Sequence, residues 1–377
     1  MIKPSANKRR TTRDWILDIH AWMGAFAAVF ILSVSVTGIA LAFTGPLMKL
    51  ETGALSVTGE RSAPVDIGAL MEKAKAEAGE TFLPVGYLGP NAEIVTPADM
   101  IYGMSDMPQN GGEVQIVSFD PATGDATGQF YLDRTLTHKL IDFHYEVLAG
   151  GFGAGLIAII GILMAMLAVM GLVLWWPGRG RVWKKAKKTS LKGPWITKSF
   201  RLHGLAGFWL SLAVLLWGLS GTYWSKPDWF PQGLTPQTDR MASALPADFL
   251  EASCEGSVSM NDAVNLALKQ NPGHRLFEAE FSAPWQNYHA LYLASGADID
   301  HLDADTRVWV HASCENMSVT ETISGAAKTG AVAQGLHSGR IFGALRIPIV
   351  VFIGLALILM SLTGLHLWWK RIFRRRA

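Results

Sequence analysis

The sequence predicts an α-helical membrane protein: a four-helix transmembrane bundle made from a duplicated helix–outer domain–helix unit, with two outer α+β domains. Three observations predict this fold: four long apolar runs, a segregation of basic from acidic residues, and an internal repeat. The 377-residue chain is 50% hydrophobic and only 17% charged, with a formal net charge of +2. This composition is untypical of a soluble or disordered protein, and the near-neutral charge disfavours nucleic-acid binding.

Four apolar runs are each long enough to cross the hydrocarbon core of a bilayer, which takes about 20 helical residues. They lie at 15–43, 152–176, 202–224 and 345–369. The first run begins too far from the N-terminus and is too long for a cleaved signal peptide. We therefore expect all four runs to be membrane helices in contact with lipid.

Basic residues gather in three short stretches that flank these runs. The segment before the first run, the link 177–198 and the tail after the fourth run hold 18 of the 33 Lys and Arg residues. The segments 47–151 and 226–343 hold 29 of the 31 Asp and Glu residues. Since basic loops stay in the cytoplasm, both termini are expected there, and the two acidic segments are expected on the other side.

The predicted domain boundaries follow from the runs and the charges. They are 1–46 (N-terminus and first helix), 47–151 (first outer domain), 152–176 (second helix), 177–198 (basic loop), 199–225 (third helix), 226–343 (second outer domain) and 344–377 (fourth helix and basic tail). Helical and alternating patterns predict a small α+β unit with a short antiparallel sheet in each outer domain. Cys254 and Cys314 both fall in the second outer domain, where the sequence leaves open whether they form a disulfide.

The chain repeats itself when positions are counted from a histidine. His20 in the first run and His203 in the third are each followed by glycine at +4 and +18. His144 and His337, before the second and fourth runs, are each followed by glycine at +6, +17 and +27 and by tryptophan at +31 and +32. The two copies begin and end on the same side, so they are parallel repeats about an axis along the membrane normal.

Five of the ten histidines lie in or at the ends of the apolar runs: His20, His144, His203, His337 and His366. An ionisable side chain at membrane depth is costly and indicates a function. Facing imidazoles from symmetry-related helices are what bis-histidine ligation of a b-type haem requires. This predicts an outer haem between His144 and His337 and an inner haem between His20 and His203. His366 has no mate, because Val173 occupies the equivalent position, and its pairing with either inner histidine is an alternative.

Other residues fit such a cofactor. Gly24 and Gly207 lie one helical turn from the inner histidines and leave room for a flat macrocycle, although small residues also serve close helix packing. Arg340 and Arg346 flank the outer end of the fourth run, where haem propionates need cations; lipid-interface snorkelling is the alternative for Arg346. No nucleotide-binding fingerprint is present, so the expected electron donor is quinol or a separate cytoplasmic reductase.

Several motifs resemble those of the PepSY-associated transmembrane family of iron-regulated bacterial inner-membrane proteins. They are His20-Ala-Trp-Met-Gly24, His337-Ser-Gly-Arg340, the helix exits Gly171-Leu-Val-Leu-Trp-Trp176 and Gly364-Leu-His-Leu-Trp-Trp369, and the PepSY-like turn Phe119-Asp-Pro-Ala-Thr-Gly124. The resemblance implies a bacterial inner-membrane location and two periplasmic PepSY-like domains. It also implies a di-haem b reductase that reduces ferric siderophore in the periplasm and releases Fe(II), with the same histidines as ligands. The alternatives are a quinol-linked cytochrome b that passes electrons to a periplasmic protein, and a non-enzymatic PepSY-domain membrane anchor or signalling protein.

Overall fold

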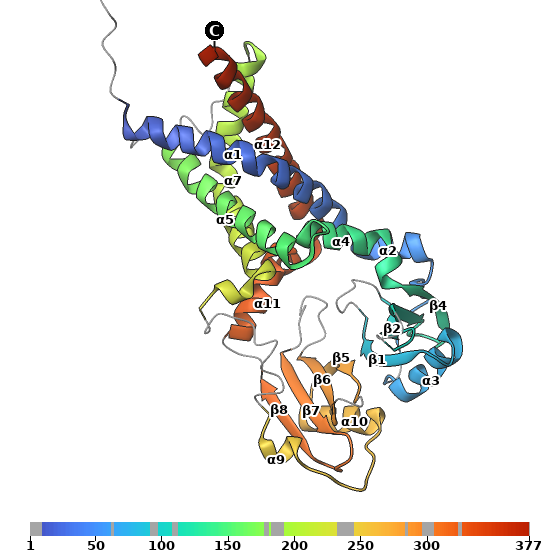
Figure 1. The fold of residues 1–377 in the computed structure, drawn as a ribbon. Coiled ribbons are helices and arrows are strands. Elements are labelled where there is room, and N and C mark those ends of the chain that lie inside the picture. Colours follow the sequence, from blue (N-terminus) through green and yellow to red (C-terminus); the bar gives the residue numbers. More distant parts are fainter. Residues whose placement is uncertain are drawn as a thin grey trace, which may run out of the picture. The chain divides into compact units, whose positions relative to one another are not determined.

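The structure is a computed structural model, and its elements are shown in Figure 1. It describes residues 10–61, 64–90, 97–107, 112–176, 181, 192–231, 245–282, 286–295, 305–322 and 326–376. The chain divides into two compact units, each made of segments from both halves of the sequence. The bundle unit comprises Met1–Ala42, Asp142–Trp229 and Leu336–Ala377, and the sheet unit comprises Phe43–Ile141 and Phe230–Gly335.

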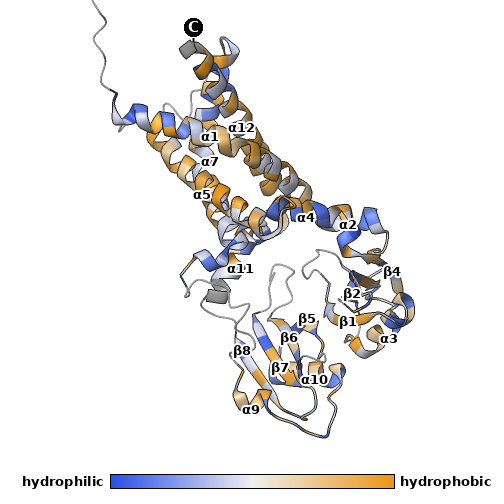
Figure 2. Ribbon diagram, in the orientation of Figure 1, coloured by the Kyte–Doolittle hydropathy of each residue, from blue (hydrophilic) through white to orange (hydrophobic). Residues whose placement is uncertain are grey.

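Four long helices form the bundle unit: α1 (Thr12–Leu41), α5 (Gly150–Trp175), α7 (Trp195–Ser225) and α12 (Arg346–Arg376). All four are long and apolar enough to cross a membrane, and their ribbons are mostly coloured as hydrophobic in Figure 2. The four predicted spans are thus confirmed. Helix α12 continues through the basic tail, because Lys and Arg side chains stabilise the C-terminal end of a helix.

The most extensive helix contacts in the bundle are between α5 and α7 and between α1 and α12. Helices α1 and α7 each pack against both α5 and α12, so α1 lies diagonally across the bundle from α7. A Cβ at Gly161 of α5 would lie 2.6 Å from the carbonyl oxygen of Gly218 on α7, and one at Gly354 of α12 would lie 2.5 Å from Ile39 of α1. Gly161 and Gly354 are repeat mates. The second helix of each repeat therefore packs closely on the first helix of the other repeat.

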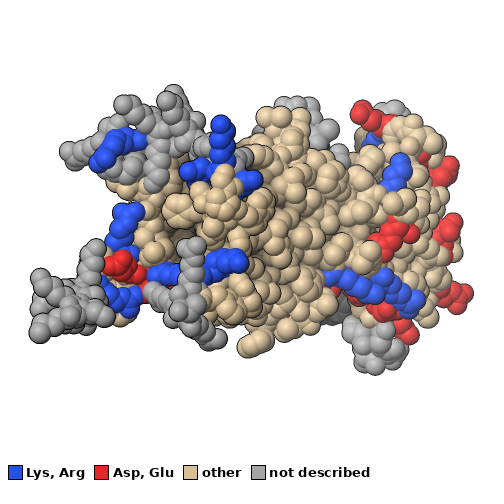
Figure 3. All heavy atoms as spheres, turned by 90° about the horizontal axis from the view of Figure 1, so that it is seen from above, with Lys and Arg blue, Asp and Glu red and all other residues tan. Residues whose placement is uncertain are grey.

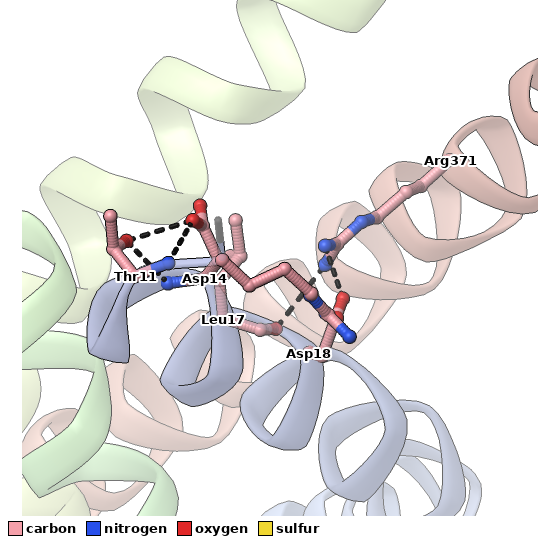
Figure 4. Close-up of polar contacts among 6 residues, drawn as sticks. Thr11, Asp14, Leu17, Asp18 and Arg371 are labelled. Carbon is pink, nitrogen blue, oxygen red and sulfur yellow. Dashed lines mark hydrogen bonds and ion pairs between the residues drawn. The ribbon is translucent and has the colours of Figure 1, made fainter. Parts of the chain in front are cut away.

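One end of the bundle carries the basic residues, and we call it the basic end; Figure 3 shows Lys and Arg side chains there beside a broad uncharged surface. A capping box starts α1: the Thr11 N–H donates to Asp14 (2.8 Å), and the Asp14 N–H donates back to the Thr11 hydroxyl (3.3 Å). Arg371 of α12 donates to Asp18 and to the Leu17 carbonyl oxygen (3.3 Å), as Figure 4 shows. These bonds fix the start of α1 against the end of α12.

A short helix precedes the second long helix of each repeat. Helix α4 (Leu136–Glu146) leads into α5, and α11 (Ala326–His337) leads through a 3₁₀ turn into α12. The chain turns at Gly150 (φ 55°) and Gly343 (φ 53°), which are the two glycines at offset +6. A positive φ is readily adopted only by glycine. The repeated glycine at +6 therefore marks the turn between the histidine-bearing helix and the long helix.

The sheet unit contains one eight-stranded antiparallel sheet in the order β4-β3-β2-β1-β5-β6-β7-β8. The strands are β1 (Leu83–Leu88), β2 (Asp99–Met104), β3 (Val114–Phe119), β4 (Ala126–Tyr131), β5 (His274–Glu280), β6 (Tyr288–Ser295), β7 (Thr306–His311) and β8 (Ser318–Thr322). Each repeat contributes a four-stranded meander, and the two meanders join where β1 pairs with β5. The two short sheets expected from the sequence are thus joined edge to edge, which leaves neither first strand open to solvent.

Short helices cover both faces of this sheet. Helices α3 (Ile67–Ala78) and α10 (Met260–Gln270) pack on one face, and α2 (Thr44–Thr52) and α9 (Ala247–Leu250) contribute to the cores on the other. Cys254, between α9 and α10, is bonded to Cys314 in the turn after β7. The disulfide that the sequence left open is therefore present.

Candidate functional site

Two pairs of histidine rings face each other inside the bundle unit. In the first pair, His144 of α4 and His337 of α11 have ring centroids 6.1 Å apart and ring planes 59° apart. In the second pair, His20 of α1 and His203 of α7 have centroids 6.3 Å apart and planes 81° apart. We call these the α4–α11 pair and the α1–α7 pair. Each pair joins symmetry-related elements of the two repeats.

The Nδ1 atoms of the α4–α11 pair bond to the long helices of their own repeats. His337 Nδ1 donates to the Trp217 carbonyl oxygen (3.2 Å) and lies 3.3 Å from the Ser220 hydroxyl. His144 Nδ1 lies 2.9 Å from the Thr37 hydroxyl, the repeat mate of Ser220. Because a carbonyl oxygen only accepts, the proton on His337 is assigned to Nδ1. That tautomer leaves Nε2 unprotonated and able to ligate a metal.

Each of the four rings rests on a glycine of its own repeat. The pairs are Gly38 with His144, Gly221 with His337, Gly171 with His20 and Gly364 with His203. A Cβ added at these glycines would lie 3.0, 2.8, 3.5 and 3.1 Å, respectively, from Cε1 of the histidine. The imidazoles therefore pack directly against helix backbone. Gly38 and Gly221, at +18 from His20 and His203, contact the α4–α11 pair. Gly171 and Gly364, at +27 from His144 and His337, contact the α1–α7 pair.

The α1–α7 pair is less symmetric than the α4–α11 pair. His203 Nδ1 donates to the Met360 carbonyl oxygen (3.1 Å) and lies 3.2 Å from the Thr363 hydroxyl. His20 Nδ1 is buried and has no hydrogen-bond partner among the described residues. The first repeat has Met170 where the second has Thr363, so the hydroxyl acceptor is missing there. One ring of this pair is thus held by hydrogen bonds and the other by packing.

His366 lies outside both ring pairs. Its Nδ1 is 2.9 Å from the hydroxyl of Ser199, a buried residue of α7. Of the three histidines considered for the inner site, the structure brings the rings of His20 and His203 together. The symmetric pairing is therefore the one that the geometry favours.

The remaining predicted residues lie near the pairs but contact other groups. A Cβ at Gly24 would be 3.7 Å from Leu167, and one at Gly207 would be 3.7 Å from Met360, both ordinary contacts. Arg346 Nε donates to the Ser338 carbonyl oxygen (3.3 Å), close to His337 in the chain, and its charge interacts with that of Arg340. The role of these four residues in binding a cofactor stays a prediction.

The hydroxyl partners of the histidines are the functional residues that sequence reasoning missed. Thr37 and Ser220 both stand at +17 from the first histidine of their repeat, so the repeated hydroxyl was a readable signal. Thr363 has no repeat mate, and nothing in the pattern marks it. Within the described residues, no three His, Cys, Asp or Glu side chains converge on a metal position.

The sheet unit contains a buried polar cluster of a different kind. The Tyr87 hydroxyl donates to Asp99 (2.7 Å), and Arg61 forms an ion pair with the same carboxylate. Burial raises the pKa of Asp99, and the Arg61 charge opposes that shift. The carboxylate is held by charge and by hydrogen bonds, so we interpret the cluster as structural.

The sequence was also compared with known proteins. The model of the PepSY-associated TM region family matches residues 17–371, which include all four paired histidines. No curated protein matches the sequence significantly. Since the family match covers nearly the whole chain, the protein belongs to the PepSY-associated TM region family.

Proposed function

We propose that the protein is a di-haem b reductase that carries single electrons across a bacterial inner membrane and reduces ferric siderophore iron in the periplasm. The spacing of the histidine pairs carries this proposal. A bond from a metal to an imidazole nitrogen is about 2 Å long, so rings on opposite sides of one metal have centroids about 6 Å apart. The observed separations are 6.1 and 6.3 Å.

The donor set also suits haem better than a bare metal ion. Each site offers two imidazoles from the chain, whereas zinc is usually held by three or four protein ligands. His144 with His337 would hold one haem and His20 with His203 the other, and each haem would supply a one-electron Fe(III)/Fe(II) couple. Hydrogen bonds to Nδ1 orient three of the four rings, as such bonds do for metal-ligating histidines.

Three observations support an electron path from the cytoplasm to the periplasm. His20 and Gly38, the seat of His144, are 18 residues apart on α1, so the pairs lie about 27 Å apart along the helix. The positive-inside bias puts the α1–α7 pair on the cytoplasmic side. The Cys254–Cys314 disulfide suits an oxidising periplasm around the sheet unit. Electrons would enter at the α1–α7 pair and leave at the α4–α11 pair.

Ferric siderophore fits as the acceptor because hard oxygen ligands hold Fe(III) much more strongly than Fe(II). One electron delivered in the periplasm would release iron without cleavage of the siderophore. Arg340 and Arg346, near His337, would pair with haem propionates.

The first test is the absorption spectrum and haem content of the purified full-length protein. We expect a Soret band, two haems per chain, and the loss of one haem in either His144→Ala or His20→Ala. His366→Ala should keep both haems. A protein without a Soret band, or with one unaffected by the ligand changes, contradicts the proposal and supports the anchor or signalling alternative.

The second test mixes the reduced protein with ferric siderophores in an anaerobic stopped-flow instrument. We expect at least one iron complex to oxidise the haems. If no complex does so while a periplasmic protein fraction does, the quinol-linked cytochrome is the better description.

A further inference from the structure

One polar contact breaks the symmetry of the bundle. His366 Nδ1 lies 2.9 Å from the Ser199 hydroxyl, between α12 and α7. At the equivalent positions the first repeat has Val173 and Ile16, at the same offsets from its own histidines. The fold therefore accepts an apolar pair at this level, and the second repeat has a polar pair instead.

Stability does not explain this exchange. Burying a hydroxyl or an imidazole in an apolar bundle costs free energy, and the hydrogen bond recovers only part of it. Ser199 is buried, and His366 is half-buried at membrane depth. An ionisable group in this setting indicates a function, and the ring pairs at 6.1 and 6.3 Å do not include His366.

The contact lies one helical turn from the α1–α7 pair. Ser199 precedes His203 by four residues on α7, and His366 follows Thr363 by three residues on α12. Since His203 and Thr363 are themselves in contact (3.2 Å), the His366–Ser199 contact is the next layer toward the basic end, about 5 Å further along. This layer adjoins the place where electrons would enter.

Exposed aromatic side chains lie near Ser199 on α7: Trp195 is one turn before it, and Phe200 follows it in the chain. Trp195 and Phe200 are 64% and 70% exposed, and Lys198 Nζ lies 5.9 Å from the centre of the Trp195 ring, as is typical of aromatic side chains at a membrane interface. His366 bonds to Ser199 through Nδ1, which leaves Nε2 as the ring nitrogen for a ligand. The site thus offers a hydrogen-bonding imidazole to a molecule that arrives through the bilayer.

We propose that His366 and Ser199 bind the head group of a quinol, which is the electron donor of this protein. The inference rests on the proposed function, in which the adjacent His20–His203 pair holds a haem. A quinol loses two protons with its two electrons, so it needs a proton acceptor beside the electron acceptor. A protein reductase that docks at the surface needs no such group inside the bundle.

Oxidation of the quinol releases two electrons and two protons. Two O–H bonds of the quinol break, and the ring becomes a quinone. A haem held by His20 and His203 would supply a one-electron acceptor, so the two electrons would leave the quinol one at a time. With each electron, His366 Nε2 would accept the hydrogen bond of one hydroxyl and then its proton, and would release this proton to water at the basic end before it accepts the second. Ser199 would hold the imidazole through Nδ1.

The test uses the purified holoprotein in detergent with duroquinol, a short synthetic quinol. His366→Val and Ser199→Ile install the side chains of the first repeat, and Val173→Ala is the control at the equivalent position. We expect His366→Val to keep both haems and their reduction by dithionite but to slow reduction by duroquinol at least tenfold. Ser199→Ile should slow it severalfold, and Val173→Ala should not change it.

Equilibrium binding of duroquinone, measured by dialysis, gives a readout that does not depend on electron transfer. We expect the dissociation constant to rise at least tenfold in His366→Val. Unchanged binding and unchanged reduction in a variant with both haems would overturn the quinol site and leave the proposed function standing. Loss of one haem in His366→Val would make His366 a ligand and also overturn it. If the wild-type protein lacks haem, the proposed function fails, and dialysis alone decides whether the site binds quinone.

Discussion

At the residue scale, the histidines are positioned by groups of their own repeat. Gly221 seats His337 and the Trp217 carbonyl oxygen binds it, while Gly38 and Thr37 do the same for His144. Each repeat therefore orients its own imidazoles. The distance across a pair depends instead on how closely the two repeats approach, and this approach is set at Gly161 and Gly354.

The glycine seats predict a contrast between two substitutions on α7. In Gly221→Ala, the new Cβ would lie 2.8 Å from Cε1 of His337, so the ring must move, and such overpacking costs about 1–3 kcal/mol. In Gly207→Ala, the Cβ would meet only the flexible end of Met360 at 3.7 Å. The better helix propensity of alanine should then raise the free energy of unfolding by about 0.5–1 kcal/mol. The thermal midpoint of the purified protein should fall in the first variant and hold or rise in the second. Equal midpoints would show that Gly221 does not seat the ring.

The histidine pairs were predictable from the sequence because the repeat makes them symmetry mates. The packing around them was only partly predictable. Gly24 shares a helix face with His20, but a single helix does not reveal which neighbour covers that face, and here it is Leu167. Contacts between helices depend on the arrangement of the bundle, and the spacing of residues along one helix does not specify that arrangement.

At the element scale, the break between each histidine-bearing helix and the following long helix sets the position of the α4–α11 pair. The turn after α4 holds Val147 (φ 45°) and Leu148 (φ 59°) as well as Gly150. A β-branched residue in the left-handed region is strained, so the surrounding structure holds this turn in place. A continuous helix through this segment would rotate His144 relative to α5.

Adjacent glycines at the start of α5 test the turn. Gly150 has φ 55°, whereas Gly151 lies within the helix, and a Cβ at either position would meet no atom within 4 Å. Gly150→Ala should therefore cost about 1–2 kcal/mol through backbone strain alone. Gly151→Ala should raise the free energy of unfolding by about 0.5–1 kcal/mol, because alanine is the better residue inside a helix. Thermal unfolding of the two variants measures the difference, and a Gly150→Ala protein as stable as Gly151→Ala would mean that the positive φ is dispensable.

The sheet shows which element contacts a sequence can indicate. Each meander joins strands that are close in the chain, and strand-like patterns predicted a short antiparallel sheet in each outer domain. The junction of β1 with β5 joins Leu88 to Glu278 and Gly86 to Glu280, far apart in sequence. Both strands have ordinary strand patterns, and no residue in them specifies that the free edges meet.

At the scale of the whole molecule, the duplication gives the bundle an approximate two-fold axis, and each histidine pair has one ring from each repeat. Departures from symmetry occur on both sides. The α1–α7 side has Thr363 against Met170, and His366 with Ser199 against Val173 with Ile16; the α4–α11 side has Arg340 and Arg346 against Val147 and Gly153. The α4–α11 side keeps equivalent hydroxyls in both repeats. Symmetric groups thus position the histidine pairs, and the polar His366–Ser199 contact lies at the end where we place the donor.

The charge distribution predicts the orientation of the whole chain. The basic end should face the cytoplasm, so green fluorescent protein fused after residue 377 should fluoresce, and alkaline phosphatase fused there should be inactive. The sheet unit should then lie in the oxidising periplasm, and its Cys254–Cys314 disulfide should protect both thiols from alkylation in unreduced, denatured protein. Cys254→Ser should expose the thiol of Cys314 to the reagent. An active phosphatase at the C-terminus would mean that the chain has the opposite orientation, and the proposed direction of electron flow would then be wrong. Two free thiols in the wild-type chain would contradict the oxidising location of the sheet unit.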